Sequence, residues 1–284
     1  MNQFDFSKVV TTGAAGMIGA YVDFGVRPSK GELDVLNRDE VMRFVKEHKP
    51  NAIIHLAAAT DTVRCENDPS YAYTLNGVGT LNVALAAQAV GAVMVYVSTS
   101  RVFSGDKQGP YTETDEPNAT SIYGKSKQLG EAITSLVAPE YLIVRTSWVF
   151  GGGSARDNKF YGTVLKKLLG GKKELVALDD VLGSPTYAKD LIESIKEMLE
   201  KKSRGIFHIG NGAPATRADI ARCMVEHMGL TTSVRAVGRE YFETGYLLPA
   251  NEAISSERIQ LRPWQDALKE YINIEWITNF SPRA

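Results

Sequence analysis

Tyr123 and Lys127 form the residue pair with the clearest capacity for chemistry. They are four residues apart in a segment, 121–137, that has the pattern of a helix, so both side chains lie on one face of it. A free tyrosine has a pKa of about 10. A neighbouring ammonium group stabilises the phenolate, and we expect it to bring the pKa of Tyr123 toward a value suited to proton transfer at neutral pH.

Hydroxyl groups that could act with this pair follow a predicted buried strand. The run 93–97 is continuously apolar, as in strands covered on both faces of a sheet, and Ser98, Thr99 and Ser100 come directly after it. In doubly wound parallel sheets, ligands bind beyond the carboxyl ends of the strands. We therefore expect these hydroxyls to face a ligand.

Three glycines at intervals of three mark a candidate phosphate-binding loop. Gly13, Gly16 and Gly19 follow the first predicted strand and precede a helix. In such a loop the first glycine permits a tight turn, and the second lets the backbone approach a pyrophosphate. The third lets the helix pack closely on the sheet, with the phosphates at the helix amino terminus. The position after the first strand favours a dinucleotide site over an ordinary glycine-rich turn.

The segment after this loop, where the preference for NAD(H) or NADP(H) is usually determined, is short. Only 14 residues separate Gly19 from Asp34, whereas a βαβ unit takes about 30 or more. We expect a very short or absent second strand. Arg27 and Lys30 either meet the 2′-phosphate of NADP(H) or belong to a solvated loop. Asp34 with Val35 either closes the next strand, where a carboxylate reaches the adenine, or belongs to a turn or helix cap. NADP(H) and NAD(H) both remain open.

The order of predicted elements indicates an α/β fold with a doubly wound parallel Rossmann sheet. Apolar runs and helical patterns alternate through the first 150 residues, which is typical of a parallel sheet with crossover helices. We expect strands at 9–10, 52–56, 93–97 and 141–146, and helices at 38–48, 70–90 and 121–137.

Beyond about residue 150 the pattern indicates a smaller, partly interleaved C-terminal portion. We expect helices at 160–169, 188–201 and 216–228 and strands at 174–178 and 205–209; Thr216 and Asp219 form a capping box. We predict an NAD(P)-binding Rossmann domain, residues 1–150 with 186–210, and a substrate-binding portion, residues 151–185 with 211–284.

Composition excludes several classes of protein. The 32 Lys and Arg nearly cancel the 33 Asp and Glu, so no net field attracts nucleic acid or a membrane surface. The two cysteines, Cys65 and Cys223, cannot form a Cys-rich metal site, and we expect no metal. Residues 1–8 have neither the basic start nor the apolar stretch of a secretory signal. We expect a cytoplasmic location.

Several motifs, taken in order, resemble the extended short-chain dehydrogenase/reductases. They are the glycine loop at 12–19, His55-Leu56-Ala57-Ala58-Ala59-Thr60, Asn76 with Gly79-Thr80-Leu81-Asn82, Ser98-Thr99 and Tyr123-x-x-x-Lys127. Within these proteins the chain looks most like the dTDP-4-dehydrorhamnose reductase family of nucleotide-sugar reductases. The closer resemblance lies in Leu33-Asp34-Val35, Val102-Phe103-x-Gly105, Tyr111-x-Glu113, residues 123–131, Arg145-Thr146-Ser147-Trp148-Val149 and Gly183-x-Pro185-Thr186.

The resemblance implies roles for individual residues. Tyr123 would be the general acid at a substrate carbonyl, Thr99 would hydrogen-bond the carbonyl oxygen, and Lys127 would hold the nicotinamide ribose and polarise the tyrosine. The expected cofactor-binding residues are Gly13, Ala15, Gly16, Met17, Ile18, Asp34, Val35, Leu56, Ala57, Ala58, Asn76, Ser98, Tyr123 and Lys127. The expected substrate-binding residues are Thr60, Arg101, Val102, Phe103, Arg145, Trp148 and Pro185.

Four of these residues could instead have a structural role or no specific role. Asn76 could be a helix-interface amide, Arg145 a paired structural arginine, Trp148 a core residue and Arg101 an exposed side chain without a specific contact. The chain also departs from the family pattern on the substrate side. Ser100-Arg101 stands where the family has Asp-Tyr, Val181 replaces a Gln, and Leu248-Pro249 stands where the family tends to have Arg-Pro.

The leading hypothesis is an NAD(P)H-dependent reductase of a keto group on a nucleotide-linked deoxysugar, in carbohydrate biosynthesis. A nucleotide-sugar epimerase with bound NAD and a non-catalytic NAD(P)-binding regulatory subunit are the alternatives, since a fold and its motifs do not by themselves establish activity. The expected partner is a nucleotide-sugar substrate, and family analogy suggests a homodimer.

Overall fold

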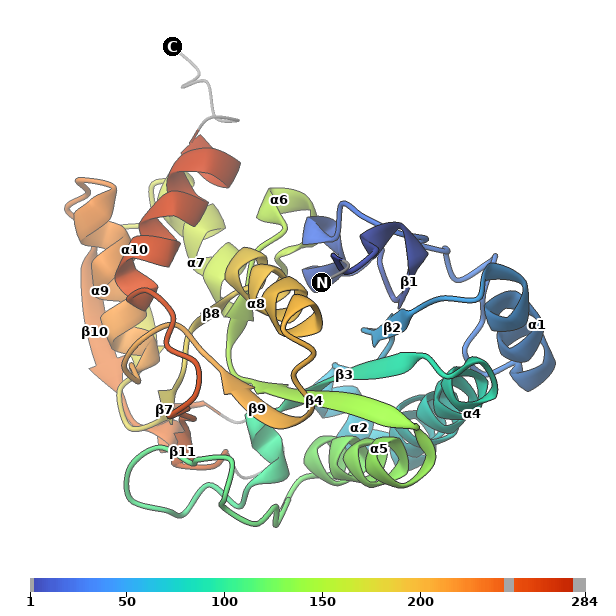
Figure 1. Ribbon diagram of the computed structural model, residues 1–284. Coiled ribbons are helices and arrows are strands. Elements are labelled where there is room, and N and C mark those ends of the chain that lie inside the picture. The colour runs from blue at the N-terminus through green and yellow to red at the C-terminus, as the bar shows by residue number, and fades with distance from the viewer. Residues whose placement is uncertain (1–2, 243–247, 278–284) are drawn as a thin grey trace.

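The computed structural model describes residues 3–242 and 248–277. The centre of the molecule is a sheet of five strands in the order β1-β2-β3-β4-β9 (Figure 1). Neighbouring strands are parallel throughout, so their carboxyl ends meet at one edge. The predicted α/β fold with a parallel Rossmann sheet is confirmed. The strands are β1 Val9–Thr12, β2 Ala52–His55, β3 Val93–Thr99, β4 Glu140–Thr146 and β9 Gly205–Ile209.

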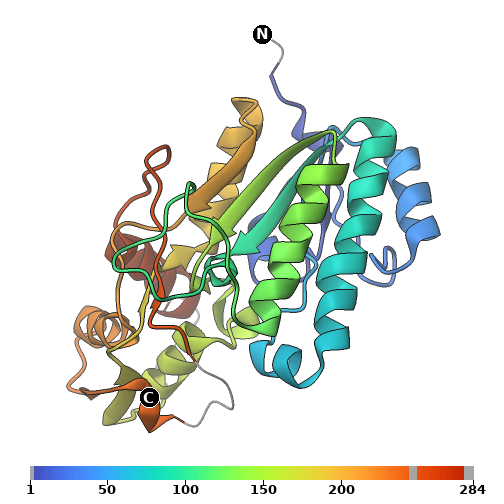
Figure 2. The same cartoon turned by 90° about the horizontal axis from the view of Figure 1, so that it is seen from below.

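Helices cover both faces of this sheet. The helices α1 (Arg38–His48), α4 (Thr80–Val90) and α5 (Ile122–Val137) lie side by side on one face (Figure 2). On the other face α8 (Ala188–Glu200) packs with the short 3-10 helix η2 (Ile18–Tyr21). Side chains alternate between the two layers, as a strand requires: Ile53, Met94 and Ile143 pack under the first group, and Ile54, Val95 and Val144 under the second.

The sheet edge beyond β1 is reduced to one residue. Val26 bridges to Val10 in parallel, with hydrogen bonds from Thr11 N to Val26 O (2.8 Å) and from Val26 N to Val9 O (2.7 Å). This confirms that the second strand is very short. A single bridged residue also leaves no strand at this edge with which a further strand could pair.

Of the two alternatives for Asp34 and Val35, the structure favours the turn over the end of a strand. Asp34 lies in a turn in which its carboxylate accepts a hydrogen bond from Leu36 N at 3.0 Å. An Asx turn of this kind satisfies the backbone locally, without a sheet partner. Leu33 and Val35 are nevertheless buried, in the core under α1 and α4.

The helix predicted at 70–90 is helical but divided into three pieces. α3 (Pro69–Tyr73) is followed by a π-helical segment, η3 (Thr74–Gly79), and then by α4. A π segment widens the helix locally and turns side chains away from their regular positions. Asn76 lies in this segment, and its carbonyl oxygen accepts a hydrogen bond from the Thr80 hydroxyl at 2.7 Å.

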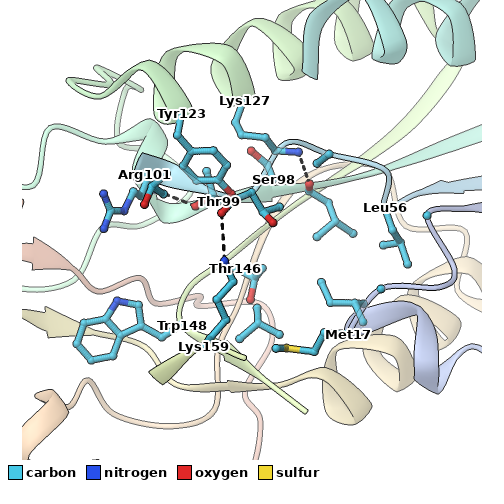
Figure 3. A pocket seen from close by; sticks show the side chains of 18 of the residues that line it. Met17, Leu56, Ser98, Thr99, Arg101, Tyr123, Lys127, Thr146, Trp148 and Lys159 are labelled. Atoms are coloured by element: carbon cyan, nitrogen blue, oxygen red, sulfur yellow. Dashed lines mark hydrogen bonds between the residues drawn. The ribbon is translucent and has the colours of Figure 1, made fainter. Parts of the chain in front are cut away.

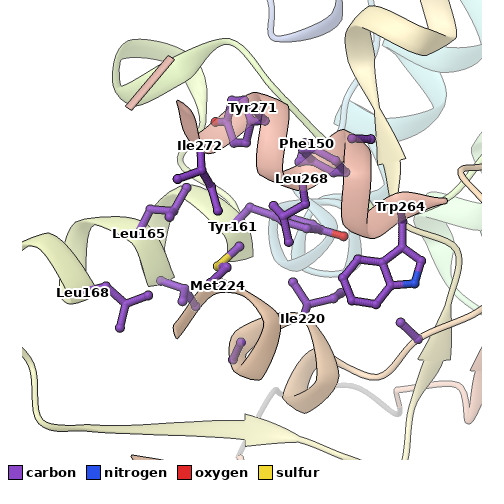
Figure 4. Packing of buried hydrophobic residues seen from close by; sticks show 14 of the residues in the cluster. Phe150, Tyr161, Leu165, Leu168, Ile220, Met224, Trp264, Leu268, Tyr271 and Ile272 are labelled. Atoms are coloured by element: carbon purple, nitrogen blue, oxygen red, sulfur yellow. The ribbon is translucent and has the colours of Figure 1, made fainter. Parts of the chain in front are cut away.

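The C-terminal portion has its own apolar core (Figure 4). Its helices α7 (Phe160–Leu169), α9 (Arg217–His227) and α10 (Trp264–Tyr271) surround buried aromatic and aliphatic side chains, beside the parallel pair β6 (Glu174–Leu178) and β10 (Ser233–Val237). The capping box of Thr216 and Asp219 at the start of α9 is confirmed. The proposed residue boundaries of the two portions stay a prediction.

Two short parallel strand pairs lie between this portion and the carboxyl edge of the central sheet. β5 (Val149–Phe150) pairs with β8 (Thr186–Tyr187), and β7 (Leu182–Gly183) pairs with β11 (Asn251–Glu252). They bring together chain segments that are 37 and 69 residues apart in the sequence. The remaining elements are η1 Phe6–Lys8, α2 Thr62–Asn67, η4 Ser100–Val102, α6 Gly153–Arg156, η5 Arg239–Tyr241 and η6 Ile272–Ile277.

Two further observations concern the sequence-based exclusions. Within residues 3–242 and 248–277, every helix is too short or too polar to cross a membrane. Residues 1 and 2 of the segment tested for a secretory signal lie outside the described residues.

Substituting Gly130 by Ala tests the close packing of α5 on β3. An added Cβ would lie 2.0 Å from the Tyr96 Oη and 3.0 Å from the Asn76 carbonyl oxygen. Gly→Ala in a helix interior ordinarily stabilises by about 1 kcal/mol. Here we expect Gly130→Ala to lower the free energy of unfolding by roughly 1–3 kcal/mol through overpacking, measured by urea denaturation. In the control, Gly77→Ala, the new Cβ would meet only the flexible Leu129 side chain. Equal losses in both variants would contradict the prediction.

Candidate active site

A cleft of about 560 Å³ opens at the carboxyl edge of the central sheet (Figure 3). Its walls come from the loops after β1, β2 and β3, from α5 and from the C-terminal portion. Of the residues predicted from the sequence, it brings together Gly13, Gly16, Met17, Ile18, Leu56, Ala57, Ala58, Thr60, Ser98, Thr99, Arg101, Tyr123, Lys127 and Trp148.

The predicted catalytic residues meet where β3 ends and α5 begins. Thr99 is the last residue of β3, and its hydroxyl accepts a hydrogen bond from Arg101 N at 3.2 Å. The Ser121 side chain caps α5 by accepting from Gly124 N at 3.1 Å, which fixes the helix start and places Tyr123 in its first turn. A side chain at Gly124 would collide with the backbone of Arg101, where an added Cβ lies 2.1 Å from the carbonyl oxygen.

Lys127 lies one turn further along α5 and is buried against β3. Its Nζ donates a hydrogen bond to Val97 O at 2.8 Å and lies 4.0 Å from the Tyr96 ring centroid. Burial lowers the pKa of Lys127 to about 7, and the charge of Glu131 opposes that shift. Loss of water around the ammonium is the dominant effect.

Burial also raises the pKa of Tyr123 above its ordinary value, while a hydrogen bond with Thr99 and the charge of Arg101 act in the opposite direction. The expected lowering of the Tyr123 pKa by Lys127 is therefore wrong. The physical reason is that desolvation of the phenolate outweighs the favourable charges around it. A raised pKa keeps Tyr123 protonated at neutral pH, which is the state that a general acid needs.

The three glycines of the loop differ in what an added side chain would meet. Gly13 has a φ of 71°, and an added Cβ would lie 2.5 Å from Ala57 N. At Gly19 an added Cβ would lie 2.3 Å from Ala14 O. These two glycines are needed by the fold itself. At Gly16 the contact would be 3.3 Å, to Gly13 O. Gly16 therefore matches the position where a backbone approaches a phosphate.

Two buried hydroxyls in the cleft support a polar ligand. Ser98 Oγ and Thr146 Oγ1 are buried and have no hydrogen-bond partner in the part of the chain that the structure describes. Both residues line the cleft, at the ends of the neighbouring strands β3 and β4. Since buried polar groups are nearly always hydrogen-bonded, a ligand with polar groups fits here. Together with the glycine loop, these residues fit a nicotinamide dinucleotide.

Four residues of the predicted cofactor set do not line the cleft. Ala15 is exposed on the glycine loop, and its carbonyl accepts from Arg156 Nε at 3.3 Å. Asp34 and Val35 lie in the turn and the core described above. Asn76 uses its amide to bind the Ala59 backbone, accepting from the N–H at 2.7 Å. It supports the loop that borders the cleft and does not contact the cleft itself.

Four residues of the predicted substrate set are also placed elsewhere. Val102 and Phe103 are buried in an apolar cluster with Tyr111 and Ile254. Pro185 is buried, and its carbonyl accepts from Asn211 N. Arg145 is buried and forms two hydrogen bonds to Glu131, from Nε at 2.9 Å and from Nη2 at 2.8 Å. The paired structural arginine was one of the two interpretations of Arg145, and the structure favours it.

Sequence reasoning missed several lining residues, mostly from the C-terminal portion. Lys159 Nζ donates to Thr60 O at 3.2 Å, and the Arg217 guanidinium lies 5.2 Å from the ring centroids of both Trp148 and Phe160. Glu252 completes this wall. No motif marked these residues.

Thr146 had a usable signal, because it ends a predicted strand at the same sheet edge as Thr99. Thr62, Val97, Val149 and Tyr161 were also missed, and Gly19 had been assigned only a packing role.

Metal ligands are not gathered anywhere in residues 3–242 and 248–277, where no group of three or more His, Cys, Asp or Glu could hold a metal ion. The fold and the site instead define a dinucleotide-binding α/β oxidoreductase with the threonine, tyrosine and lysine arrangement of short-chain dehydrogenase/reductases. The model of the RmlD substrate binding domain family matches residues 7–276, and the chain belongs to that family.

Similarity to known proteins extends over nearly the whole chain. The spore coat polysaccharide biosynthesis protein SpsK of Bacillus subtilis (strain 168) is 33% identical, with 94% of this chain and 97% of the relative covered. The crystal structure of dTDP-4-dehydrorhamnose reductase from Bacillus anthracis in complex with NADP is 30% identical. It has a TM-score of 0.89 and covers 96% of this chain and 99% of that chain. A dTDP-4-dehydrorhamnose reductase from Clostridium acetobutylicum is 32% identical with a TM-score of 0.87, covering 94% and 98%.

Lys127→Met should reveal the cost of burying the lysine. The pKa of this amine is 10.5 ordinarily and about 7 in the folded protein. Between these values the unfolded chain binds more protons than the folded protein, so the stability of the wild type rises with pH. We expect Lys127→Met to be more stable than the wild type at pH 7, by on the order of a few kcal/mol, and the difference to shrink toward pH 10. Urea denaturation across this range, with the exposed Lys125→Met as control, measures it. A difference independent of pH would contradict the assignment.

Arg145→Met tests whether this arginine is structural. The substitution leaves Glu131 as a buried carboxylate without its cation, and we expect a loss of about 3–5 kcal/mol in the free energy of unfolding. The double variant Arg145→Met/Glu131→Leu should recover most of that loss, because it removes both charges. Thermal and urea denaturation compare the three proteins. A side chain that served only to bind substrate would produce no such loss in the single variant.

Proposed function

We propose that this protein reduces a keto group on a nucleotide-linked deoxysugar with NAD(P)H. The observation that supports this most directly is that Thr99, Tyr123 and Lys127 converge in the cleft that the glycine loop borders. The relatives named dTDP-4-dehydrorhamnose reductase, similar over nearly their whole length, support the same reaction class.

The glycine loop and the end of β3 would hold the cofactor. Gly16 would face the pyrophosphate, and Ser98 and Lys127 would lie beside the nicotinamide end. An ammonium has three N–H donors; one binds Val97 O, and the group can also donate to ribose hydroxyls. When bound, NAD(P)H supplies the hydride that adds to the carbonyl carbon.

The chain's own residues would act on the carbonyl oxygen. Thr99 would donate a hydrogen bond to it, and this interaction strengthens as negative charge develops on the oxygen. Tyr123, kept protonated by burial, would transfer its phenolic proton to the oxygen. The phenolate left behind would be stabilised by Thr99 and by the nearby charge of Arg101. Burial in the cleft excludes water and makes each of these interactions stronger than in solution.

The substrate would occupy the half of the cleft that the C-terminal portion supplies. Lys159 and Arg217 are cations that line it, and both could neutralise the diphosphate of a nucleotide sugar. Thr60, Trp148 and Phe160 border the same space. Two of the relatives are named dTDP-4-dehydrorhamnose reductase, and a thymidine-diphosphate-linked 4-keto-6-deoxysugar is therefore the first substrate to test.

Cofactor preference, location and assembly remain proposals. The B. anthracis relative is in complex with NADP, which favours NADP(H), with NAD(H) the alternative. Arg27, one of two candidates for the 2′-phosphate, is exposed and donates to Val22 O at 2.5 Å.

The free thiols of Cys65 and Cys223 agree with a reducing cytoplasm. A homodimer is proposed by family analogy.

Tyr123→Phe is the decisive variant for this function. It removes the proton donor and keeps the ring, so we expect kcat/KM to fall by about 10²- to 10⁴-fold with little change in NADPH affinity. The assay follows NADPH absorbance with a nucleotide-linked 4-keto-6-deoxysugar. Tyr141→Phe, near the amino end of β4 and away from the cleft, is the matched control.

Three outcomes would overturn parts of the proposal. Equal rates for Tyr123→Phe and the wild type would remove the catalytic assignment. Tightly held oxidised NAD, with sugar interconversion but no net NADPH oxidation, would instead indicate an epimerase. Cofactor binding without turnover, together with a stoichiometric enzyme partner, would indicate a regulatory subunit.

A further inference from the structure

A second buried arginine–glutamate pair, Arg101 with Glu252, lies in the wall of the cleft. Arg101 Nη2 donates to Glu252 Oε1 at 2.8 Å, and the side chains are only 10% and 6% exposed. Arg101 follows β3, and Glu252 lies in β11, 151 residues further along the chain. The pair therefore joins the sheet edge to the C-terminal portion within the wall of the cleft.

Neighbouring groups hold the Glu252 carboxylate in a fixed orientation. Trp148 Nε1 donates to its Oε2 at 3.2 Å, and the Ser147 hydroxyl donates to the Glu252 backbone carbonyl at 2.9 Å. A carboxylate can accept about four hydrogen bonds, and Arg101 and Trp148 account for two. Glu252 can therefore accept further hydrogen bonds from a ligand without moving.

The pair adjoins the groups that would hold the reacting carbonyl. Arg101 donates its backbone N–H to Thr99 Oγ1 at 3.2 Å. The charges of Arg101 and Glu252 act on the pKa of Tyr123 in opposite directions, the first lowering it and the second raising it. If Thr99 and Tyr123 hold the carbonyl oxygen, the substituents of the neighbouring ring carbons are the next atoms to meet the pair.

Comparison with the pair formed by Arg145 and Glu131 separates a structural role from a ligand-binding role. That pair is joined through two guanidinium nitrogens and does not line the cleft. A buried ion pair adds little stability over apolar residues of the same size, because both charges lose their water. Stability alone therefore does not account for Arg101 and Glu252 in a substrate cleft. Arg101 also replaces the tyrosine expected from the family pattern at this position.

We propose that Arg101 and Glu252 are specificity-determining residues that bind the sugar ring of the substrate. Glu252 accepts a hydrogen bond from a hydroxyl group on the carbon next to the reacting carbonyl, and Arg101 donates to the oxygen of that hydroxyl or of its ring neighbour. This inference rests on the proposed function, and it names the feature of the sugar that this chain selects: a free hydroxyl beside the keto group.

The kinetic test compares two substrates and three proteins. The substrates are a thymidine-diphosphate-linked 4-keto-6-deoxyhexose with a hydroxyl at the adjacent carbon and its deoxy analogue at that carbon. We expect the wild type to prefer the hydroxylated sugar by tenfold or more in kcat/KM. Glu252→Gln should reduce that preference to about twofold, mainly through KM. Glu113→Gln, which changes a partly buried carboxylate outside the cleft, should leave the preference unchanged.

Arg101 has a conservative and a disruptive variant. Arg101→Lys keeps the positive charge and should retain part of the preference, whereas Arg101→Gln should lose it as Glu252→Gln does. Melting temperatures of all variants are measured alongside. If the melting temperatures fall while the substrate preference stays at the wild-type value, the pair is only a structural connection and the inference is overturned.

A binding experiment separates this inference from the proposed function. Calorimetry measures the affinities of thymidine diphosphate and of the same nucleotide linked to a 6-deoxyhexose, and neither measurement requires turnover. We expect Glu252→Gln to weaken binding of the sugar-linked nucleotide about tenfold and to leave thymidine diphosphate binding unchanged. Equal effects on the two ligands, or none on either, would overturn the inference even if the wild type proves to be a reductase. If the wild type does not reduce the sugar, but Glu252→Gln still weakens binding of only the sugar-linked nucleotide, the proposed function alone would be overturned.

Discussion

The close packing of α5 on β3 is the constraint on which the candidate site depends. Gly124 and Gly130 leave no room for a Cβ, the first against the Arg101 carbonyl and the second against the Tyr96 hydroxyl. Between them, Lys127 lies flat against the strand and donates to Val97 O. The helix can approach β3 only because these positions are small, and this approach sets where Tyr123 stands relative to Thr99.

Burial at this contact also sets the electrostatics of the site. Lys127 loses water and its pKa falls to about 7, while the pKa of Tyr123 rises for the same reason. The two pKa values shift in opposite directions for the same reason, because desolvation favours the neutral form of both groups. The site therefore holds a protonated tyrosine next to a lysine that titrates near neutrality. A bound dinucleotide adds its own charges to this balance.

Much of this arrangement was predictable from the sequence, and the failures have identifiable causes. Continuous apolar runs correctly predicted the strands at 52–56 and 93–97, because strands covered on both faces need apolar side chains at every position. The helical pattern predicted at 121–137 agrees with α5, which begins at Ile122. The choice between a strand end and a turn at Asp34 stayed open in the sequence, and it depends on an edge strand that is reduced to one residue at Val26. The pKa of Tyr123 was misjudged because spacing along a helix reports neighbours but not burial.

Local features could be predicted from the amino-acid sequence: the glycine loop, the hydroxyls that follow β3, and the tyrosine and lysine on one helix face. These features depend on residues close together in the chain, where spacing fixes geometry. The partners of the charged side chains depend instead on how the chain folds. Arg145 was a candidate for substrate until folding placed Glu131 beside it, and Arg101 meets Glu252 from 151 residues away. Contacts at such separations arise from how whole layers pack, and local spacing contains no measure of that packing.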